Sequence, residues 1–223
     1  MNIGKAFSYQ FEDPDWMKKI GIAAAVMLIP LVGGIVVSGW GVEVARRVIH
    51  REQYPLPEWN DFMGYLVKGL KLMVISLVYM LPIILVSICP SVLIPFASEQ
   101  GEDAIMTVVS IVSICFSCLV IIYALFAGLV LPAALGKFAA TDDLKSAFRF
   151  GEVIGMVRAK PMVFVMVLLG GFLSSLIGSA GSIACGIGVL VTVPYSIAIN
   201  GHLWGQAYLE AGQDQVYAPT MQM

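Results

Sequence analysis

Four long stretches without Asp, Glu, Lys or Arg dominate the pattern of polar and apolar positions along the chain. They cover residues 20–42, 72–98, 104–136 and 161–209. A helix needs about 20 apolar residues to cross the hydrocarbon core of a bilayer. Each stretch is therefore long enough to cross once, and the fourth is long enough to cross twice. The pattern predicts an all-α integral membrane protein with about four to six membrane helices.

The first stretch is interrupted near its middle. Pro30 lacks a backbone donor, and Gly33 and Gly34 permit a sharp turn. We therefore expect residues 20–45 to form a short re-entrant hairpin of two helices. The alternative is one kinked span, because residues 20–44 as a single helix would be roughly 37 Å long.

The fourth stretch is interrupted in a similar way. Residues 170–188 are rich in Gly and Ser, which favours a turn. This turn is expected to divide residues 161–209 into a second hairpin of two helices.

Two segments between the stretches have the periodicity of amphipathic helices. Residues 57–71 place apolar and polar side chains on different faces, and residues 141–158 repeat the arrangement. In the first segment the apolar set is Trp59, Phe62, Met63, Leu66 and Leu70, and the polar set is Asp61, Tyr65 and Lys68. Both segments are predicted to form helices that lie in the membrane interface.

The order of elements is similar in the two halves of the chain, residues 1–98 and 104–210. We interpret this similarity as a weak internal duplication within a single polytopic membrane domain, residues 1–210. Residues 211–223 are polar and are predicted to form a C-terminal tail that is flexible unless a partner orders it.

Composition supports a membrane protein. Hydrophobic residues make up 59% of the chain and charged residues only 13%, whereas a soluble domain has about 25% charged residues. The net charge is -2, and the cations are divided among segments that flank the apolar stretches. A nucleic-acid partner is therefore not expected, and membrane lipids are the expected partners.

The charged segments also predict an orientation. Lys and Arg mark the cytoplasmic side of short loops. They are concentrated in residues 46–71 and 137–160, whereas residues 99–103 contain acids and no cation. We expect the protein to be a multi-pass protein of the inner cell membrane, with its basic loops in the cytoplasm.

Nine side chains are predicted to lie at an interface or to contact lipid headgroups. Indole rings prefer the membrane boundary, Arg side chains bind lipid phosphates, and residues four apart on a helix share a face. The nine are Trp16, Trp40, Glu43, Arg46, Arg47, Trp59, His202, Trp204 and Gln206. The tryptophans are expected to anchor the protein at the membrane boundary, Glu43 to pair with the arginines of its own helix, and His202 and Gln206 to form hydrogen bonds at the interface. The alternative is that some of these residues build a binding site.

Small residues recur at every fourth position in two of the stretches. Such stripes let helix backbones approach closely. The candidates for helix packing are Gly128, Gly136, Gly170, Ser174 and Gly178. They pack either against other helices of this chain or against another subunit.

The sequence contains little that points to catalysis. Cys115 and Cys118 form a C-x-x-C pair, but a metal site needs about four ligands, and no second pair is present. No nucleophile elbow, zinc-protease motif, phosphate-binding loop or dinucleotide fingerprint occurs. We therefore expect no catalytic residue, no metal and no cofactor, and the protein is not expected to be an enzyme.

Three segments resemble a known family. The segments "FEDPDWMKKI", "GWGVEVARRVI" and "LPEWNDFMGYLVKGLK" are similar to the bacterial and archaeal membrane-protein family known as domain of unknown function 4013. The resemblance extends over residues 1–210. It implies a membrane protein without an assigned activity, and it brings no catalytic residues to this chain.

The most favoured function is that of a structural or accessory subunit of a membrane complex, with other subunits or further copies of the chain as partners. A small transporter or channel for a neutral or lipidic solute is the alternative, because both halves contain apolar segments interrupted by Gly or Pro. The third hypothesis, an enzyme of the headgroup layer, requires Glu43, His50 and His202 to converge with the arginines.

Overall fold

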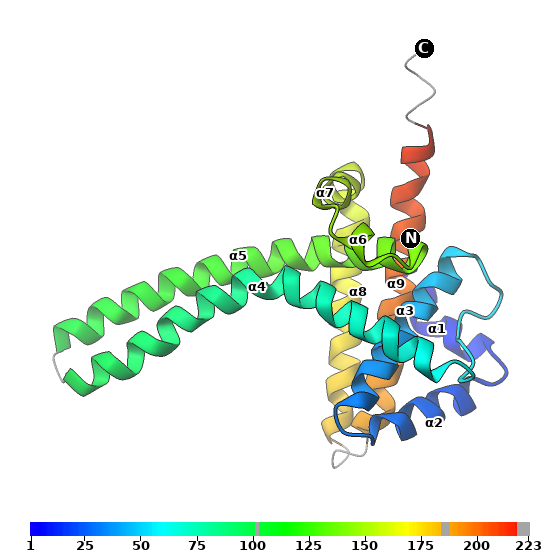
Figure 1. The fold of residues 1–223 in the computed structure, drawn as a ribbon, viewed down its shortest axis with the longest axis horizontal. Coiled ribbons are helices and arrows are strands. Elements are labelled where there is room, and N and C mark those ends of the chain that lie inside the picture. Colours follow the sequence, from blue (N-terminus) through cyan, green and yellow to red (C-terminus); the bar gives the residue numbers. More distant parts are fainter. Residues whose placement is uncertain (101–102, 184–187, 218–223) are drawn as a thin grey trace. The chain divides into compact units, whose positions relative to one another are not determined.

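The computed structural model describes residues 1–100, 103–183 and 188–217, and every element in these ranges is a helix (Figure 1). In chain order the elements are α1 (Ile3–Ser8), the 3-10 helix η1 (Tyr9–Glu12), α2 (Trp16–Met27), α3 (Val32–Ile49), α4 (Phe62–Gln100), α5 (Asp103–Thr141), α6 (Leu144–Ala147), α7 (Phe150–Ala159), α8 (Pro161–Ala180), the 3-10 helix η2 (Gly181–Ile183) and α9 (Val189–Tyr217). The all-α fold expected from the sequence is confirmed.

Three helices contain a segment that is long and apolar enough to cross a membrane. These segments are Phe62–Ile88 of α4, Thr107–Thr141 of α5 and Pro161–Ala180, which is the whole of α8. The larger number expected from the sequence also counts α2, α3 and α9. Of these, α2 has only 12 residues, and α3 carries three charged side chains in its second half.

Backbone contacts divide the chain into two compact units. One unit, called the helical bundle below, comprises Met1–Ile75 and Leu129–Met223. The other, called the long hairpin, comprises Ser76–Gly128, which are the end of α4 and the beginning of α5. This division does not follow the two halves of the expected duplication, which stays a prediction.

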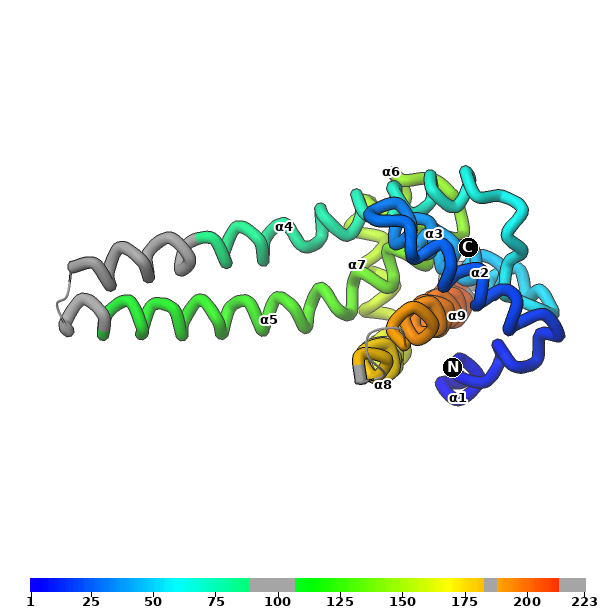
Figure 2. Tube along the Cα trace, turned by 90° about the horizontal axis from the view of Figure 1, so that it is seen from below, coloured from blue at the N-terminus to red at the C-terminus, as the bar shows by residue number. Residues whose placement is uncertain are grey.

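Within the bundle, α9 runs alongside α8 and also packs against α3 (Figures 1 and 2). Glycines bring these helices into backbone contact. A β-carbon on Gly201 of α9 would lie 2.2 Å from the carbonyl oxygen of Gly41 in α3. A β-carbon on Gly170 of α8 would lie 2.8 Å from Leu203 Cδ1 in α9. Larger side chains at these glycines would push the helices apart.

The first apolar stretch folds as two helices. α2 ends at Met27 and α3 begins at Val32, and the two helices contact each other. Leu31, just before α3, has a φ of 63°, a conformation that is uncommon for residues other than glycine. One helix cannot continue through this residue, so the hairpin expected at residues 20–45 is confirmed and the single kinked span is wrong.

The fourth stretch also folds as two helices. α8 ends at Ala180 and α9 begins at Val189, so the division of residues 161–209 into a hairpin is confirmed.

The tail expected from residue 211 onward is wrong in part. α9 continues to Tyr217, because the next proline, which would end the helix, is Pro219. Residues 218–223 lie outside the described part of the chain.

The interfacial helix expected at residues 57–71 is not a separate element. α4 begins at Phe62 and continues into the span, because no proline interrupts its hydrogen bonds before Pro82. Its polar face points into the bundle, where Tyr65 is buried, while its apolar face points outward, with Met63 66% exposed. The apolar side chains thus suit contact with lipid, and the polar side chains find partners within the protein.

Residues 141–158 form two short helices, α6 and α7, instead of one. The Asp143 carboxylate accepts a hydrogen bond from the Lys145 backbone N–H at 3.0 Å and caps α6. The chain then leaves the helical conformation at Phe148 and Arg149 before α7 begins. The predicted connection between α5 and α8 by surface helices is therefore present, but it is broken in the middle.

Candidate functional site

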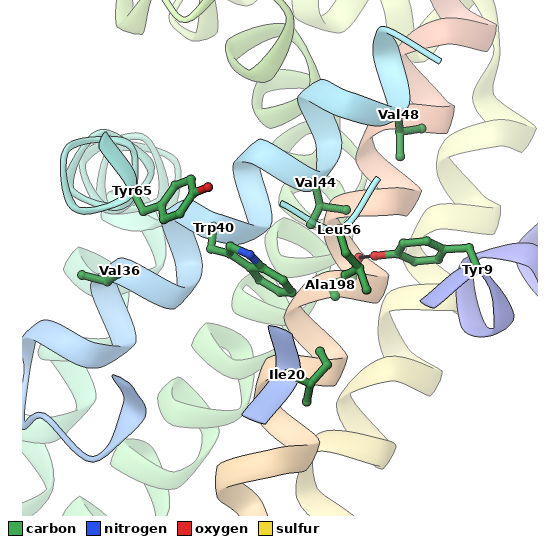
Figure 3. Close-up of a cluster of buried hydrophobic side chains, with 9 residues drawn as sticks. All are labelled: Tyr9, Ile20, Val36, Trp40, Val44, Val48, Leu56, Tyr65 and Ala198. Atoms are coloured by element: carbon green, nitrogen blue, oxygen red, sulfur yellow. Dashed lines mark hydrogen bonds between the residues drawn. The ribbon is translucent and has the colours of Figure 1, made fainter. Parts of the chain in front are cut away.

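Trp40 lies in a cluster of buried hydrophobic and aromatic side chains in the bundle, called the aromatic cluster below (Figure 3), and Trp59 packs against this cluster. Trp40 is fully buried, and its ring stacks on that of Trp59 at 5.6 Å. Trp40 Nε1 donates to the Pro57 carbonyl at 3.1 Å, and Trp59 Nε1 donates to the Lys19 carbonyl at 2.8 Å. The expectation that Trp40 contacts lipid headgroups is wrong, because its indole N–H is satisfied inside the protein.

The other two tryptophans are half-buried. Trp16 packs edge-to-face against Phe11, with the ring centroids 5.0 Å apart. Trp204 lines a small cavity of about 90 Å³ together with Ser38 and Leu72. Contact of Trp16 and Trp204 with lipid headgroups stays a prediction.

The expected ion pair between Glu43 and Arg47 is present, with 4.0 Å between the charged atoms, but Glu43 has a closer partner on another helix. The closer partner of Glu43 is Lys68 of α4. Arg46 pairs with Asp142 at 3.9 Å, and so the two arginines serve different contacts. Sequence spacing found the pair within α3 but could not find the partners on α4 and after α5.

A further cluster of two ion pairs, which the sequence analysis missed, is centred on the buried Lys19 of α2. Lys19 Nζ lies 2.8 Å from Asp13 and 2.9 Å from Glu58, and it also donates to the Leu56 carbonyl at 3.0 Å. Burial lowers the pKa of Lys19, but the hydrogen bonds to the two carboxylates outweigh burial and raise the pKa overall. This cluster ties α2 to the loop before α4.

A polar pocket of about 260 Å³ opens in the bundle where α1, η1, the loop after α3 and α9 meet. Three buried side chains, Tyr9, Val48 and His202, form its floor. The side chains at its rim are Lys5, Glu12, Arg51, Glu52, Gln53, Pro55 and Gln206. The pocket brings together two of the predicted residues, His202 and Gln206, but its lining includes neither Glu43 nor His50.

His202 is the most unusual side chain of this pocket. It is only 3% exposed, and its ring stacks on Tyr9 at 4.3 Å. Its Nδ1 atom is buried without a hydrogen-bond partner among the described residues. Burial and the nearby Lys5 charge lower its pKa to about 4, so the ring is neutral at physiological pH. His202 is therefore part of a pocket and does not lie at a lipid interface as expected.

Two further contacts fix the walls of the pocket. Tyr9 donates from its hydroxyl to the Ala198 carbonyl of α9 at 3.0 Å (Figure 3). Gln206 accepts a hydrogen bond from the Asn2 backbone N–H at 3.1 Å. Both contacts attach the N-terminal segment to α9. The sequence analysis missed Tyr9, Lys5 and the other rim residues because they lie far from α9 in the chain. The only sign of a polar site in the sequence was the polar run after α3, which supplies several of the rim residues.

The small residues of α8 pack against α9, as one of the two alternatives proposed. Ser174 bonds to Ser196 through their hydroxyl groups at 2.7 Å, and the β-carbon position of Gly178 is 3.4 Å from Ser196 Cβ. Gly170 contacts Leu203, as described above. A β-carbon on Gly136 of α5 would lie 3.0 Å from the Trp204 carbonyl oxygen of α9. A role in subunit contact stays a prediction for Gly128, which is partly buried in the long hairpin.

The described residues contain no group of three or more His, Cys, Asp or Glu side chains that could hold a metal ion. Cys115 and Cys118 are exposed free thiols on α5. The polar groups that line the pocket are charged side chains, two glutamine amides, the Tyr9 hydroxyl and the His202 imidazole.

A family model described as "Protein of unknown function (DUF4013)" matches residues 22–193 of the chain. No curated protein and no solved structure matches the chain. The match covers most of the first helical hairpin, the whole of the long hairpin and all of α8, and it ends within the first turns of α9.

Proposed function

Because the chain belongs to the DUF4013 family of membrane proteins, which carries no assigned activity, we propose a function from the structure: the protein is a non-catalytic subunit of a membrane complex. In this proposal the long hairpin binds a membrane helix of a different subunit. The protein resides in the inner cell membrane, with its basic loops in the cytoplasm.

The observation that carries the proposal is the apolar, exposed surface of the long hairpin. Its exposed side chains include Leu85, Ile111 and Ile122, each at least 58% exposed. The part of α5 from residue 107 to 128 is roughly 33 Å long, which matches the hydrocarbon core of a bilayer. Two helices alone cannot enclose a path for a solute, so the hairpin is better suited to attachment than to transport.

A groove between the arms of the hairpin gives the partner helix a place to pack. It has a volume of about 500 Å³ and is lined only by apolar residues and Tyr123. The Tyr123 hydroxyl donates to the Tyr79 carbonyl at 2.9 Å, which holds the two arms together. A groove that exists before binding lowers the entropic cost of association.

Site-specific photo-crosslinking in native membranes tests this proposal. A photoreactive amino acid replaces Ile111 or Ile122 on the hairpin, or Leu176 on α8 as a matched control. All three positions are apolar, helical and at least 51% exposed. We expect the same protein to be crosslinked from both hairpin positions and not from Leu176. Crosslinks to lipid alone at all three positions would overturn the proposal.

A second candidate function is transport of a small neutral or lipidic solute. It is favoured by the polar pocket in the bundle, which is lined by charged side chains and by His202. Flux of labelled solutes or lipids into vesicles that contain the purified protein would favour this function over the first.

A further inference from the structure

The polar pocket contains charged side chains that have no ion-pair partner within the described part of the chain. Lys5, Glu12 and Arg51 line the pocket, and none of them forms an ion pair within the described part of the chain. The fourth charge, Glu52, is already paired with Arg47 at 3.5 Å. The charges without an ion-pair partner are thus two cations and one carboxylate, and all three line the same cavity.

The floor of the pocket adds polar atoms without adding charge. His202 is almost completely buried, and its Nδ1 atom has no partner in the described chain. A buried polar atom without a hydrogen bond costs about 1–3 kcal/mol, and such atoms in native structures call for an explanation. A ligand or a water molecule held by a ligand would remove this cost.

We propose that this pocket binds a small zwitterion that carries a phosphate and a primary ammonium group on a short linker, which is the chemistry of phosphoethanolamine. The phosphate lies toward Lys5 and Arg51, because these cations donate charge-assisted hydrogen bonds to phosphate oxygens. The ammonium group lies toward the Glu12 carboxylate. The inference is independent of the partner proposed for the long hairpin.

Charge and size together favour a zwitterion over other ligands. A simple anion would leave Glu12 unpaired beside it, and a simple cation would face Lys5 and Arg51. The volume of about 260 Å³ is below the range of about 300–1,000 Å³ that is typical of sites for drug-sized ligands. The ligand is therefore a small molecule or the headgroup of a lipid whose acyl chains lie outside the pocket.

Nuclear magnetic resonance of the two histidine side chains tests the proposal on the full chain. The chain has only His50 and His202, so a protein labelled with nitrogen-15 histidine gives two imidazole signal sets, and a His50→Gln variant assigns them. O-phosphoethanolamine is titrated into protein in detergent. In separate samples, the protein is placed in nanodiscs of phosphatidylcholine with either phosphatidylethanolamine or phosphatidylglycerol. We expect a saturable shift of the His202 signals and no shift of the His50 signals.

Substitutions at the rim distinguish the roles of the charges. Arg51→Gln and Glu12→Gln are each expected to weaken binding by about tenfold or more, because each removes one charge-assisted hydrogen bond. Arg158→Gln and Asp15→Asn serve as matched controls, since both residues are exposed and lie outside the pocket lining. A Lys5→Gln variant provides a second measurement if Arg51→Gln fails to fold.

The outcomes separate the sources of the ligand. A shift with the free compound supports a soluble zwitterion, and a shift only in phosphatidylethanolamine nanodiscs supports a lipid headgroup. The proposal is overturned if neither probe shifts the His202 signals. It is also overturned if inorganic phosphate or phosphatidylglycerol acts equally well and Glu12→Gln has no effect, because the pocket would then be a simple anion site.

Discussion

At the scale of single residues, buried polar atoms decide which side chains hold the bundle together. Trp40 combines a large apolar ring with one N–H donor, and both are used: the ring stacks on Trp59, and the donor reaches the buried Pro57 carbonyl. His202 is also buried, but one of its nitrogen atoms is left unpaired. The first residue stabilises the fold, and the second marks a place where another molecule can bind.

Replacing Trp40 by Phe tests the structural role of its N–H group. The substitution leaves the Pro57 carbonyl without its donor and leaves a small cavity. We expect the free energy of unfolding to fall by roughly 1–3 kcal/mol. Thermal or denaturant unfolding in mild detergent measures the change. Trp204→Phe is the control, because Trp204 is half-buried and outside the aromatic cluster; equal losses in the two variants would contradict the assignment.

The depressed pKa of His202 predicts how stability changes with pH. Its pKa is about 4 in the folded protein and about 6.5 in an unfolded chain, so the unfolded chain takes up the proton first as pH falls. Stability is therefore highest above pH 6.5 and decreases toward pH 4, by about 3 kcal/mol from this residue. Lys5 and Tyr9 face the ring, and burial raises the pKa of the Tyr9 hydroxyl, so Tyr9 stays neutral in this range.

The measurement compares the wild type with a His202→Gln variant at pH 7 and at pH 4.5. Carboxylates in ion pairs also lose stability in acid, but both proteins share that loss. The difference between their unfolding free energies should therefore shrink on acidification. A difference that stays constant between the two pH values would show that His202 is not buried in its neutral form.

At the scale of elements, glycines set how closely the helices pack. Gly39 of α3 faces the backbone of α4, where an added β-carbon would lie 1.8 Å from the Tyr65 carbonyl oxygen. Gly34 is in the same helix, and an added β-carbon there meets nothing within 4 Å. These two positions form a matched pair, because the same substitution creates a backbone clash at one and none at the other.

We expect Gly39→Ala to separate α3 from α4 and to lower the free energy of unfolding by more than about 2 kcal/mol. Gly34→Ala should be neutral or stabilise the protein by up to about 1 kcal/mol, because alanine is the better helix former. Unfolding of both variants in the same detergent checks the pair. Equal stabilities would mean that the two helices do not cross at Gly39.

The elements also show what the sequence could predict. The apolar stretches and their breaks identified the helices and both hairpins, because helix length and proline act locally. The direction of the polar face of α4 was not predictable in this way. In a membrane protein such a face can turn inward: Lys68 reaches Glu43, which lies 25 residues earlier, and the buried Tyr65 donates to the Glu58 carbonyl.

The pocket was beyond sequence reasoning for a related reason. His202 and Gln206 were recognised as a pair on one helical face, but Lys5 and Arg51 reach the same cavity from segments about 150 or more residues away. Periodicity describes contacts within one helix. Only the packing of α1 and the loop after α3 against α9 brings these charges together.

At the scale of the whole molecule, charge distribution predicts how the protein is oriented in the membrane. Each span lies between a basic segment and a segment with few or no cations: residues 137–160 precede α8 and contain five Lys or Arg, whereas residues 181–188, which follow it, contain none. The tip between α4 and α5 is acidic. The positive-inside rule therefore predicts that the segment between α5 and α8 lies in the cytoplasm.

Cysteine accessibility checks this orientation. After replacement of the four native cysteines by serine, single cysteines are placed at Lys145 before α8, at Ser182 after α8 and at Glu102 in the acidic tip. We expect a membrane-impermeant maleimide to label positions 102 and 182 in intact spheroplasts, and to label position 145 only after permeabilisation, because α8 and the long hairpin separate these sites. The reverse labelling would place the basic loops outside. Labelling of all three sites in intact cells would mean that α8 does not cross the membrane.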